Sequence, residues 1–156
     1  MVQYVYGLAF LNRVRYKMRA MTQADADTKT RKRRILVAED EELILRVFEA
    51  ILSKSGFEVL SAENGNRAVS LFDEAPESID LVITDLSLPG LSGEALAAHV
   101  RNRRPDMRLI FSTGNITETP QRVVDAFKGA MFLPKPFGFE DLTTMVSQAL
   151  AQQVPS

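Results

Sequence analysis

The feature that most constrains the fold is a regular alternation of short apolar runs with longer segments of helical periodicity. The apolar runs begin at Ile35, Phe57, Leu81, Leu109 and Met131. Each is followed by a segment whose apolar residues recur every three or four positions, which is typical of an amphipathic helix. Strands joined by helical crossovers are parallel and nearly always right-handed. The chain is therefore expected to form one doubly wound α/β sandwich over roughly residues 33–152.

Chain-breaking residues and burial patterns support this division. Gly56, Pro76, Pro105 and Gly129 each stand where a helical segment should stop. The runs near 35–38, 81–84 and 109–112 are almost wholly apolar, as expected of strands covered by helices on both sides. The run at 57–61 alternates in polarity instead, which favours a place at the edge of the sheet.

Composition excludes several classes of protein. With 156 residues, 46% hydrophobic and 25% charged, the chain is an ordinary globular domain rather than a disordered, collagen-like or multi-span membrane protein. It has no cysteine, which excludes disulfides, zinc-thiolate sites, iron–sulfur clusters and cysteine nucleophiles. His99 is the single histidine. No motif residue orients it, so we interpret it as a surface or boundary side chain.

The charge is divided between a basic leader and an acidic body. Residues 1–34 carry nine Lys/Arg and two acids, whereas residues 35–156 carry ten Lys/Arg and eighteen acids. An acidic body is not typical of a nucleic-acid-binding domain, so we expect no nucleic-acid partner.

Residues 1–33 are interpreted as a separate leader, disordered or helical, before a folded domain at 34–152. In residues 1–21 the basic residues follow the apolar run, the reverse of a secretory signal, and the run is too short to span a bilayer. A membrane-surface helix stays open as an alternative. We favour the interpretation that the start codon is assigned too early and that Met18 or Met21 is the true start. Residues 22–33 are interpreted as a disordered linker. The protein is expected to be cytoplasmic.

Reactive side chains gather at the predicted carboxyl ends of the strands, where ligands bind in such sheets. Glu39 and Asp40 follow the first strand, Asp85 the third, Thr113 the fourth and Lys135 the fifth. Crowded carboxylates tolerate one another when a hard cation such as Mg²⁺ lies among them. Helix capping is an alternative for Glu39 and Asp40, but it does not explain Asp85.

The same residues predict phosphoryl chemistry. A carboxylate that faces a metal ion and a lysine can attack phosphorus, which makes Asp85 the candidate nucleophile. The metal ion and Lys135 would neutralise charge on the phosphoryl group, and Thr113 could donate its hydroxyl to it. Lys135 stands between Pro134 and Pro136, which would hold it in place.

These motifs resemble the receiver domain of two-component response regulators. The matching segments are Ile35–Glu41, Thr84–Gly93, Phe111–Gly114 and Leu133–Phe137, in order and with the right spacing. The resemblance covers roughly residues 34–151. It implies the flavodoxin-like receiver fold, a five-stranded parallel sheet of order 2-1-3-4-5.

The resemblance also implies a role for each site residue. Asp85 would be the phospho-acceptor, and Mg²⁺ would be held by Glu39, Asp40, Asp85 and the backbone carbonyl of Ser87. Thr113 would be the switch hydroxyl and Phe132 the switch aromatic. Lys135 would contact the phosphoryl group, and its bond to Pro136 would be cis.

Three positions depart from the usual family pattern. Glu39 stands where aspartate is commoner, and its longer side chain would reach the metal through water. Phe132 stands where tyrosine is frequent, so a hydroxyl contact is missing. Gly114 stands where alanine is frequent, which should leave an acyl phosphate more open. None of these changes removes a reactive group.

The leading functional hypothesis is a stand-alone receiver, not an enzyme, phosphorylated by a histidine kinase or a histidine phosphotransfer protein. The chain ends a few residues past the last predicted helix, so we expect output by protein contact with an unidentified target. A receiver fragment of a hybrid kinase or of a longer transcriptional regulator is one alternative. A Mg²⁺-dependent phosphohydrolase is another, but its usual second aspartate is replaced by Ser87.

Overall fold

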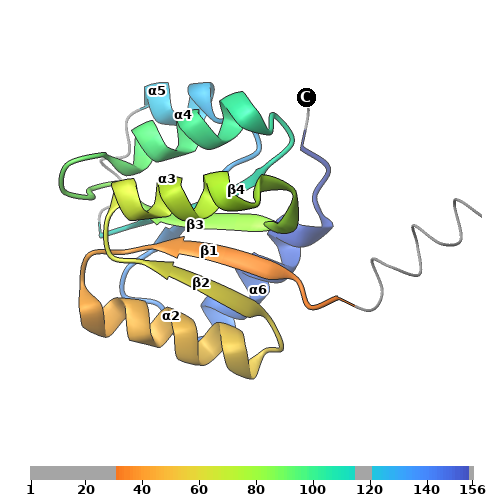
Figure 1. Ribbon diagram of the computed structural model, residues 1–156. Coiled ribbons are helices and arrows are strands. Elements are labelled where there is room, and N and C mark those ends of the chain that lie inside the picture. The colour runs from red at the N-terminus through yellow and green to blue at the C-terminus, as the bar shows by residue number, and fades with distance from the viewer. Residues whose placement is uncertain (1–30, 115–120, 155–156) are drawn as a thin grey trace, which may run out of the picture. The chain divides into compact units, whose positions relative to one another are not determined.

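A computed structural model describes residues 31–114 and 121–154 (Figure 1). The chain divides into two units, residues 1–32 and residues 33–156. The predictions for the leader fall almost entirely on residues 1–30, which lie outside the described residues. The strands and helices of the described residues all belong to the second unit.

Five parallel strands form one sheet in the order β2-β1-β3-β4-β5, which confirms the predicted topology (Figure 1). The strands are β1 Arg34–Ala38, β2 Glu58–Ala62, β3 Leu81–Asp85, β4 Arg108–Thr113 and β5 Met131–Pro134. β3 is buried along its whole length, whereas β2 begins with an exposed residue and lies at an edge. The difference between uniform and alternating polarity in the sequence therefore reflects position in the sheet.

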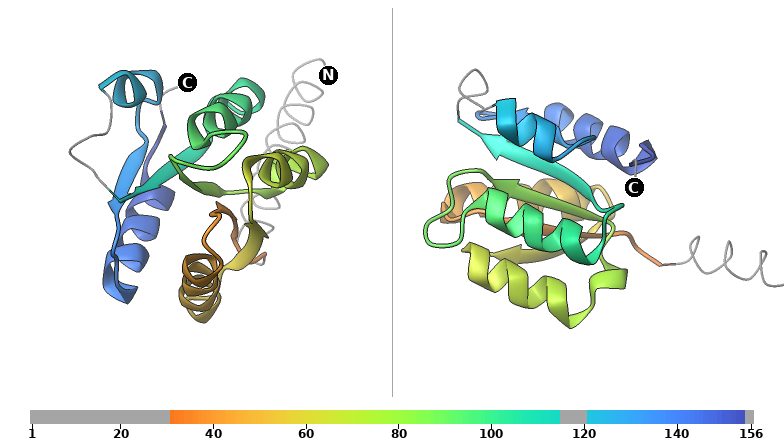
Figure 2. Two further views of the ribbon diagram at one scale, coloured as in Figure 1. Left: turned by 90° about the vertical axis from the view of Figure 1, so that its left-hand side faces the viewer. Right: turned by 90° about the horizontal axis from the view of Figure 1, so that it is seen from above.

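Helices cover both faces of the sheet, as Figures 1 and 2 show from different directions. The helices are α2 Glu42–Lys54, α3 Gly65–Glu74, α4 Gly93–Arg103, α5 Gln121–Ala126 and α6 Phe139–Ala151, with a short 3₁₀ turn at Pro76–Ser78. Helices α2 and α6 lie on one face, and α3, α4 and α5 on the other. Gly56 and Gly129 follow α2 and α5 with φ of 90° and 79°, a backbone conformation that favours glycine.

The core consists of two layers because successive strand residues point to opposite faces. Leu36, Val82 and Phe111 pack with α3, α4 and α5. Their immediate neighbours in the strands, such as Ile35, Ile83 and Ile110, pack with α2 and α6. This alternation continues to the carboxyl ends of the strands and decides on which face each site residue lies.

One feature away from the strand ends matches its prediction. The His99 Nε2 atom lies 2.9 Å from the Asp73 Oδ1 atom, and its side chain is one-third exposed, so it is a boundary residue. Among the described residues, no helix has the length and apolar character needed to cross a membrane.

Candidate functional site

The residues predicted to carry the chemistry lie at the carboxyl edge of the sheet. Asp85 is the last residue of β3 and Thr113 the last of β4. Glu39 and Asp40 follow β1 directly, and Lys135 follows β5. Because the strands are parallel, segments distant in sequence meet at this one edge.

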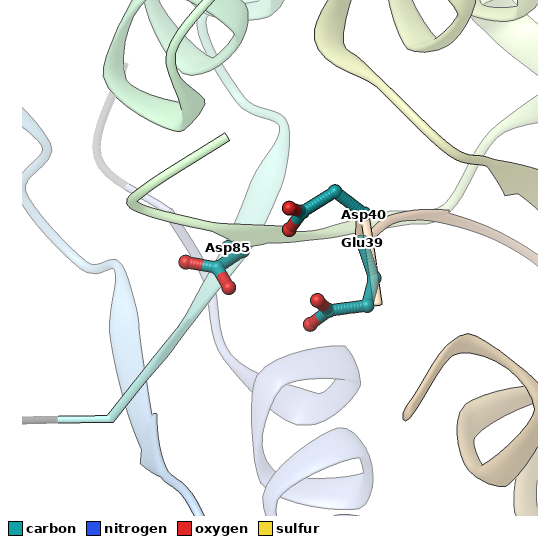
Figure 3. A group of neighbouring side chains, drawn as sticks. All are labelled: Glu39, Asp40 and Asp85. Atoms are coloured by element: carbon teal, nitrogen blue, oxygen red, sulfur yellow. The ribbon is translucent and has the colours of Figure 1, made fainter. Parts of the chain in front are cut away.

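Three carboxylates form the acidic part of the site (Figure 3). Glu39, Asp40 and Asp85 each offer a carboxylate oxygen, and these oxygens lie within 4.8 Å of one another. Glu39 is fully buried, Asp85 is 8% exposed, and Asp40 is exposed. The group therefore extends from the interior to the surface, with Asp40 at its outer side.

Lys135 is the cation that offsets this negative charge. Its Nζ atom lies 2.6 Å from Asp85 Oδ2 and 2.7 Å from Glu39 Oε2. Burial alone would lower the pKa of Lys135, but the hydrogen bonds and charges of Asp85 and Glu39 outweigh it and raise that pKa above its ordinary value. The lysine is therefore charged at neutral pH and is held between two strands.

Glu39 contacts Lys135 directly. Besides the ion pair, its Oε1 atom accepts a hydrogen bond from the backbone N–H of Glu41 at 3.1 Å. Burial raises the pKa of Glu39, and the contact with Lys135 opposes that rise only in part. The sequence predicts Glu39 as a metal residue acting through water and does not indicate this ion pair with the lysine.

Backbone contacts hold Asp85 in place. The Ser87 N–H donates to Asp85 Oδ1 at 2.7 Å, and the Leu86 N–H donates to the Ser112 carbonyl at 3.2 Å. Gly93, at the start of α4, lies so close that a Cβ atom there would collide with the Asp85 carbonyl oxygen. Only glycine fits this approach, and sequence reasoning did not single out Gly93 for it.

Thr113 ends the strand next to that of Asp85, beside the acidic group. Phe132 packs on the face of the sheet covered by α3, α4 and α5. Thr113 is 8% exposed, and its carbonyl accepts a hydrogen bond from the Lys135 N–H at 2.8 Å. The Phe132 ring is half-buried and stacks on Phe111, with ring centroids 5.6 Å apart. The strand register pairs Asp85 with Ser112, so Thr113 extends one residue beyond the acceptor.

The two remaining predictions for this region concern the backbone. The Lys135–Pro136 peptide bond is cis, as predicted from the resemblance. A Cβ atom at Gly114 would meet no atom of the described residues within 4 Å, so none of these residues fills the space beside Gly114.

The donor set fits a hard divalent cation. Carboxylate oxygens are ligands that Mg²⁺ prefers, and it keeps several waters when few protein ligands are offered. Glu39, Asp40 and Asp85 each present an oxygen to this group (Figure 3). Glu39 is engaged by Lys135 and the Glu41 amide, and Ser87 touches Asp85 through its amide. Glu39 and Asp85 therefore contact the same lysine, and Asp40 is the carboxylate that lies at the exposed side of the group.

Comparison with known proteins agrees with this fold. Residues 35–147 match the sequence model of the response regulator receiver domain. The response regulator receiver protein CpdR of Brucella abortus is 33% identical over 118 residues, which cover 76% of this chain and 97% of CpdR. The sensor kinase CckA of the same organism is 30% identical over 119 residues, but the match spans only 13% of CckA.

A solved structure gives the same result. The response regulator protein TrrA from Thermotoga maritima, in complex with Mg²⁺ and BeF, is 31% identical and has a TM-score of 0.67. The match covers 75% of this chain and 98% of that one. The chain belongs to the response regulator receiver domain family. Receiver domains are signalling domains of two-component systems that interact with histidine kinases or phosphotransfer proteins and bind Mg²⁺ at an acidic pocket.

Proposed function

We propose that residues 34–152 form a phospho-accepting receiver in which Asp85 takes a phosphoryl group from a phosphohistidine. The donor is a histidine kinase or a histidine phosphotransfer protein. The observation that carries the proposal is the position of Asp85 at the end of a buried strand, with Lys135 Nζ at 2.6 Å and two further carboxylates close by. This arrangement concentrates a nucleophile and countercharge at one edge of the sheet.

In the transfer step, an Asp85 oxygen attacks the phosphorus atom. A new P–O bond forms, the P–N bond to the histidine breaks, and its electron pair stays on the imidazole. Lys135 can leave Asp85 for the phosphoryl oxygens, where its charge offsets theirs. The Ser87 N–H keeps the Asp85 carboxyl group oriented through Oδ1.

Asp40 and Asp85 would hold Mg²⁺, with the Ser87 carbonyl as a further ligand and Glu39 reached through water. The ion would supply positive charge next to the phosphoryl oxygens. With so few protein ligands, binding is expected to be weak. Isothermal titration should show large losses of Mg²⁺ affinity in Asp40→Ala and Asp85→Asn and none in Asp106→Ala, an exposed acid outside the site. Undiminished binding in the first two variants would refute this ligand set.

The phosphorylated state should differ at Thr113 and Phe132. Charge-assisted hydrogen bonds are stronger than neutral ones, so the Thr113 hydroxyl should move toward the phosphoryl oxygens. Phe132 would then turn into the space behind it, and α5 and β5 would present a different surface. A partner that prefers this surface would shift the population toward it.

Mass spectrometry tests the acceptor directly. After incubation with acetyl phosphate and Mg²⁺, the wild-type chain should gain one phosphoryl group. Asp85→Asn should gain none, because an amide is not a nucleophile toward phosphorus, and Asp106→Asn should behave like the wild type. A phosphoryl adduct that persists in Asp85→Asn would contradict the assignment.

We further propose that the protein acts as a stand-alone, cytoplasmic receiver that signals through protein contacts. The extent of the match to CpdR supports this, since nearly all of CpdR is covered. The match to CckA favours a second possibility, a receiver that is part of a hybrid kinase. Mapping the gene product in cells by immunoblot distinguishes the two by size. Turnover of a generic phosphomonoester with Mg²⁺ would instead indicate a phosphohydrolase.

A further inference from the structure

A row of buried polar side chains crosses three neighbouring strands at the site. Ala38 of β1 pairs with Thr84 of β3, so Glu39 stands beside Asp85. Asp85 in turn pairs with Ser112 of β4. Successive residues of a strand point to opposite faces of the sheet, and this alternation puts the side chains of Glu39, Asp85 and Ser112 on the face covered by α2 and α6. Ser112 thus flanks Asp85 on the side opposite Glu39, and both flanking residues are fully buried.

The Ser112 hydroxyl has no hydrogen-bond partner among the described residues. A fully buried hydroxyl without a partner is uncommon, because it has lost water and gained nothing in exchange. Neighbouring positions of the strand, Ile110 and Phe111, are apolar and pack well. The unused polar group therefore lies at the one position of β4 that is directly beside the candidate phospho-acceptor.

We propose that the Ser112 hydroxyl donates a hydrogen bond to Asp85 once Asp85 is phosphorylated. In the unphosphorylated protein the Asp85 oxygens are already engaged by Lys135 and by the Ser87 N–H. A phosphoryl dianion attracts the lysine ammonium more strongly and draws it away. Ser112 and Asp85 are paired on adjacent strands, which are about 4.8 Å apart, so rotation about the Cα–Cβ bond of Ser112 would turn its hydroxyl toward the oxygen that Lys135 leaves. The inference rests on the proposed function of Asp85.

This hydrogen bond would speed the loss of the phosphoryl group. In hydrolysis, a water oxygen attacks phosphorus, the P–O bond to Asp85 breaks, and its electron pair returns to the Asp85 carboxylate. The water proton leaves with the inorganic phosphate or enters solvent. Negative charge grows on Asp85 as the bond breaks, and a hydrogen bond to a charged group is stronger than one to a neutral group. Ser112 would thereby set the lifetime of the signal.

Decay of the phosphorylated chain tests the proposal. Wild type and Ser112→Ala are loaded with acetyl phosphate and Mg²⁺, the phosphodonor is removed, and the adduct is followed by intact-mass spectrometry. The half-life of the adduct should be about five-fold longer in Ser112→Ala, equivalent to about 1 kcal/mol in the barrier. Ser112→Thr keeps the hydroxyl and should restore a half-life close to that of the wild type.

Two controls separate this role from a structural one. Ser61→Ala removes a hydroxyl from β2, where it bonds Glu49 and lies outside the row; its half-life should equal that of the wild type. Urea unfolding of unphosphorylated Ser112→Ala should show no loss of stability, since the hydroxyl has no partner among the described residues in that state. An unchanged or shortened half-life in Ser112→Ala overturns the inference while leaving the acceptor assignment intact. A wild-type chain that takes up no phosphoryl group overturns both.

Discussion

The face of the sheet covered by α2 and α6 ends in charged groups and the buried Ser112, whereas the face covered by α3, α4 and α5 ends in threonine and aromatic side chains. Asp85 and Lys135 belong to the first face, together with the buried Glu39. Thr113 follows the alternation of Phe111 onto the second face, where Phe132 stacks. Below these ends, both faces are closely packed apolar layers. The strand ends therefore separate a face that carries the proposed phosphoryl site, here called the chemical face, from a face that carries the proposed switch residues, here called the conformational face.

The difference follows from the pleat of the strands. Thr84 and Asp85 are consecutive, as are Ser112 and Thr113, so each pair sends one side chain to each face. Backbone hydrogen bonds connect the two sets: the Lys135 N–H donates to the Thr113 carbonyl at 2.8 Å. A structural change at Asp85 can therefore be transmitted through Lys135 to Thr113 on the other face. Substitutions should be able to disturb phosphoryl chemistry and conformational response separately.

The largest expected effect is on the chemical face, from Lys135→Met. This change leaves the fully buried Glu39 without its counter-ion, and breaking a buried ion pair from one side is strongly destabilising. We expect the free energy of unfolding to fall by about 3 kcal/mol. Urea denaturation without Mg²⁺ measures it, with Lys128→Met as an exposed control near zero. A loss as small as that of the control would show that Glu39 does not depend on the lysine.

On the conformational face, Phe132→Leu should have a smaller effect on stability and a selective effect on function. Loss of the stacked ring beside Phe111 should cost about 1 kcal/mol. Uptake of phosphate by Asp85 should stay within about twofold of wild type, equivalent to under 0.5 kcal/mol. The amide shifts that beryllofluoride induces along residues 121–134 should shrink. Phe139→Leu, at the exposed start of α6, is the matched control. Amide shifts in Phe132→Leu as large as those in the wild type would show that Phe132 takes no part in the conformational response.

Most of the fold could be predicted from the sequence because its signals are local. Apolar runs, helical spacing and glycine or proline stops indicated every described strand and α-helix, but not the 3₁₀ turn at Pro76–Ser78. The order of the strands came instead from the resemblance, since local patterns do not say which strands are neighbours. Placing Glu39, Asp85 and Lys135 at one edge then required only that the strands be parallel.

The finer features of the site depend on contacts between segments distant in sequence. The ion pair between Lys135 and Glu39 depends on how far two side chains extend across the ends of β3 and β4. The need for glycine at position 93 arises from the Asp85 carbonyl, which belongs to another element. Ser112 resembles any ordinary strand residue until the register places it beside Asp85. No sequence pattern encodes these distances.

The dependence of stability on pH should also distinguish the two faces, because the buried Glu39 lies on only one of them. Burial raises the pKa of Glu39, so between its ordinary value and the raised one the folded chain holds a proton that the unfolded chain has lost. By linkage, this group makes stability fall as pH rises through that window. Lys135, with its raised pKa, loses its contribution only in the alkaline range. Glu39→Gln should remove this dependence of stability on pH in the acidic range.

Urea unfolding of both proteins across the acidic to neutral range, without Mg²⁺, measures that slope. The wild-type curve should approach or cross the Glu39→Gln curve as pH falls, because protonation relieves the buried charge. Parallel curves would mean that Glu39 titrates like an exposed carboxyl group. Glu42→Gln, an exposed acid three residues further on, should leave the wild-type slope unchanged.

The smallest expected effect is that of a substitution at Gly114, the residue that follows the end of β4. It lines a groove of about 430 Å³ together with Glu41, Ile44 and Lys135. A methyl group there would meet no atom of the described residues within 4 Å, so Gly114→Ala should fold normally and gain a few tenths of a kcal/mol from a less flexible unfolded chain. The methyl would partly shield an acyl phosphate from water. Its half-life should become about twofold longer, a change of about 0.4 kcal/mol. Gly138→Ala, at the start of α6, is the matched control and should leave the half-life unchanged. Equal half-lives in all three proteins would mean that the methyl group does not hinder the approach of water to the phosphoryl group.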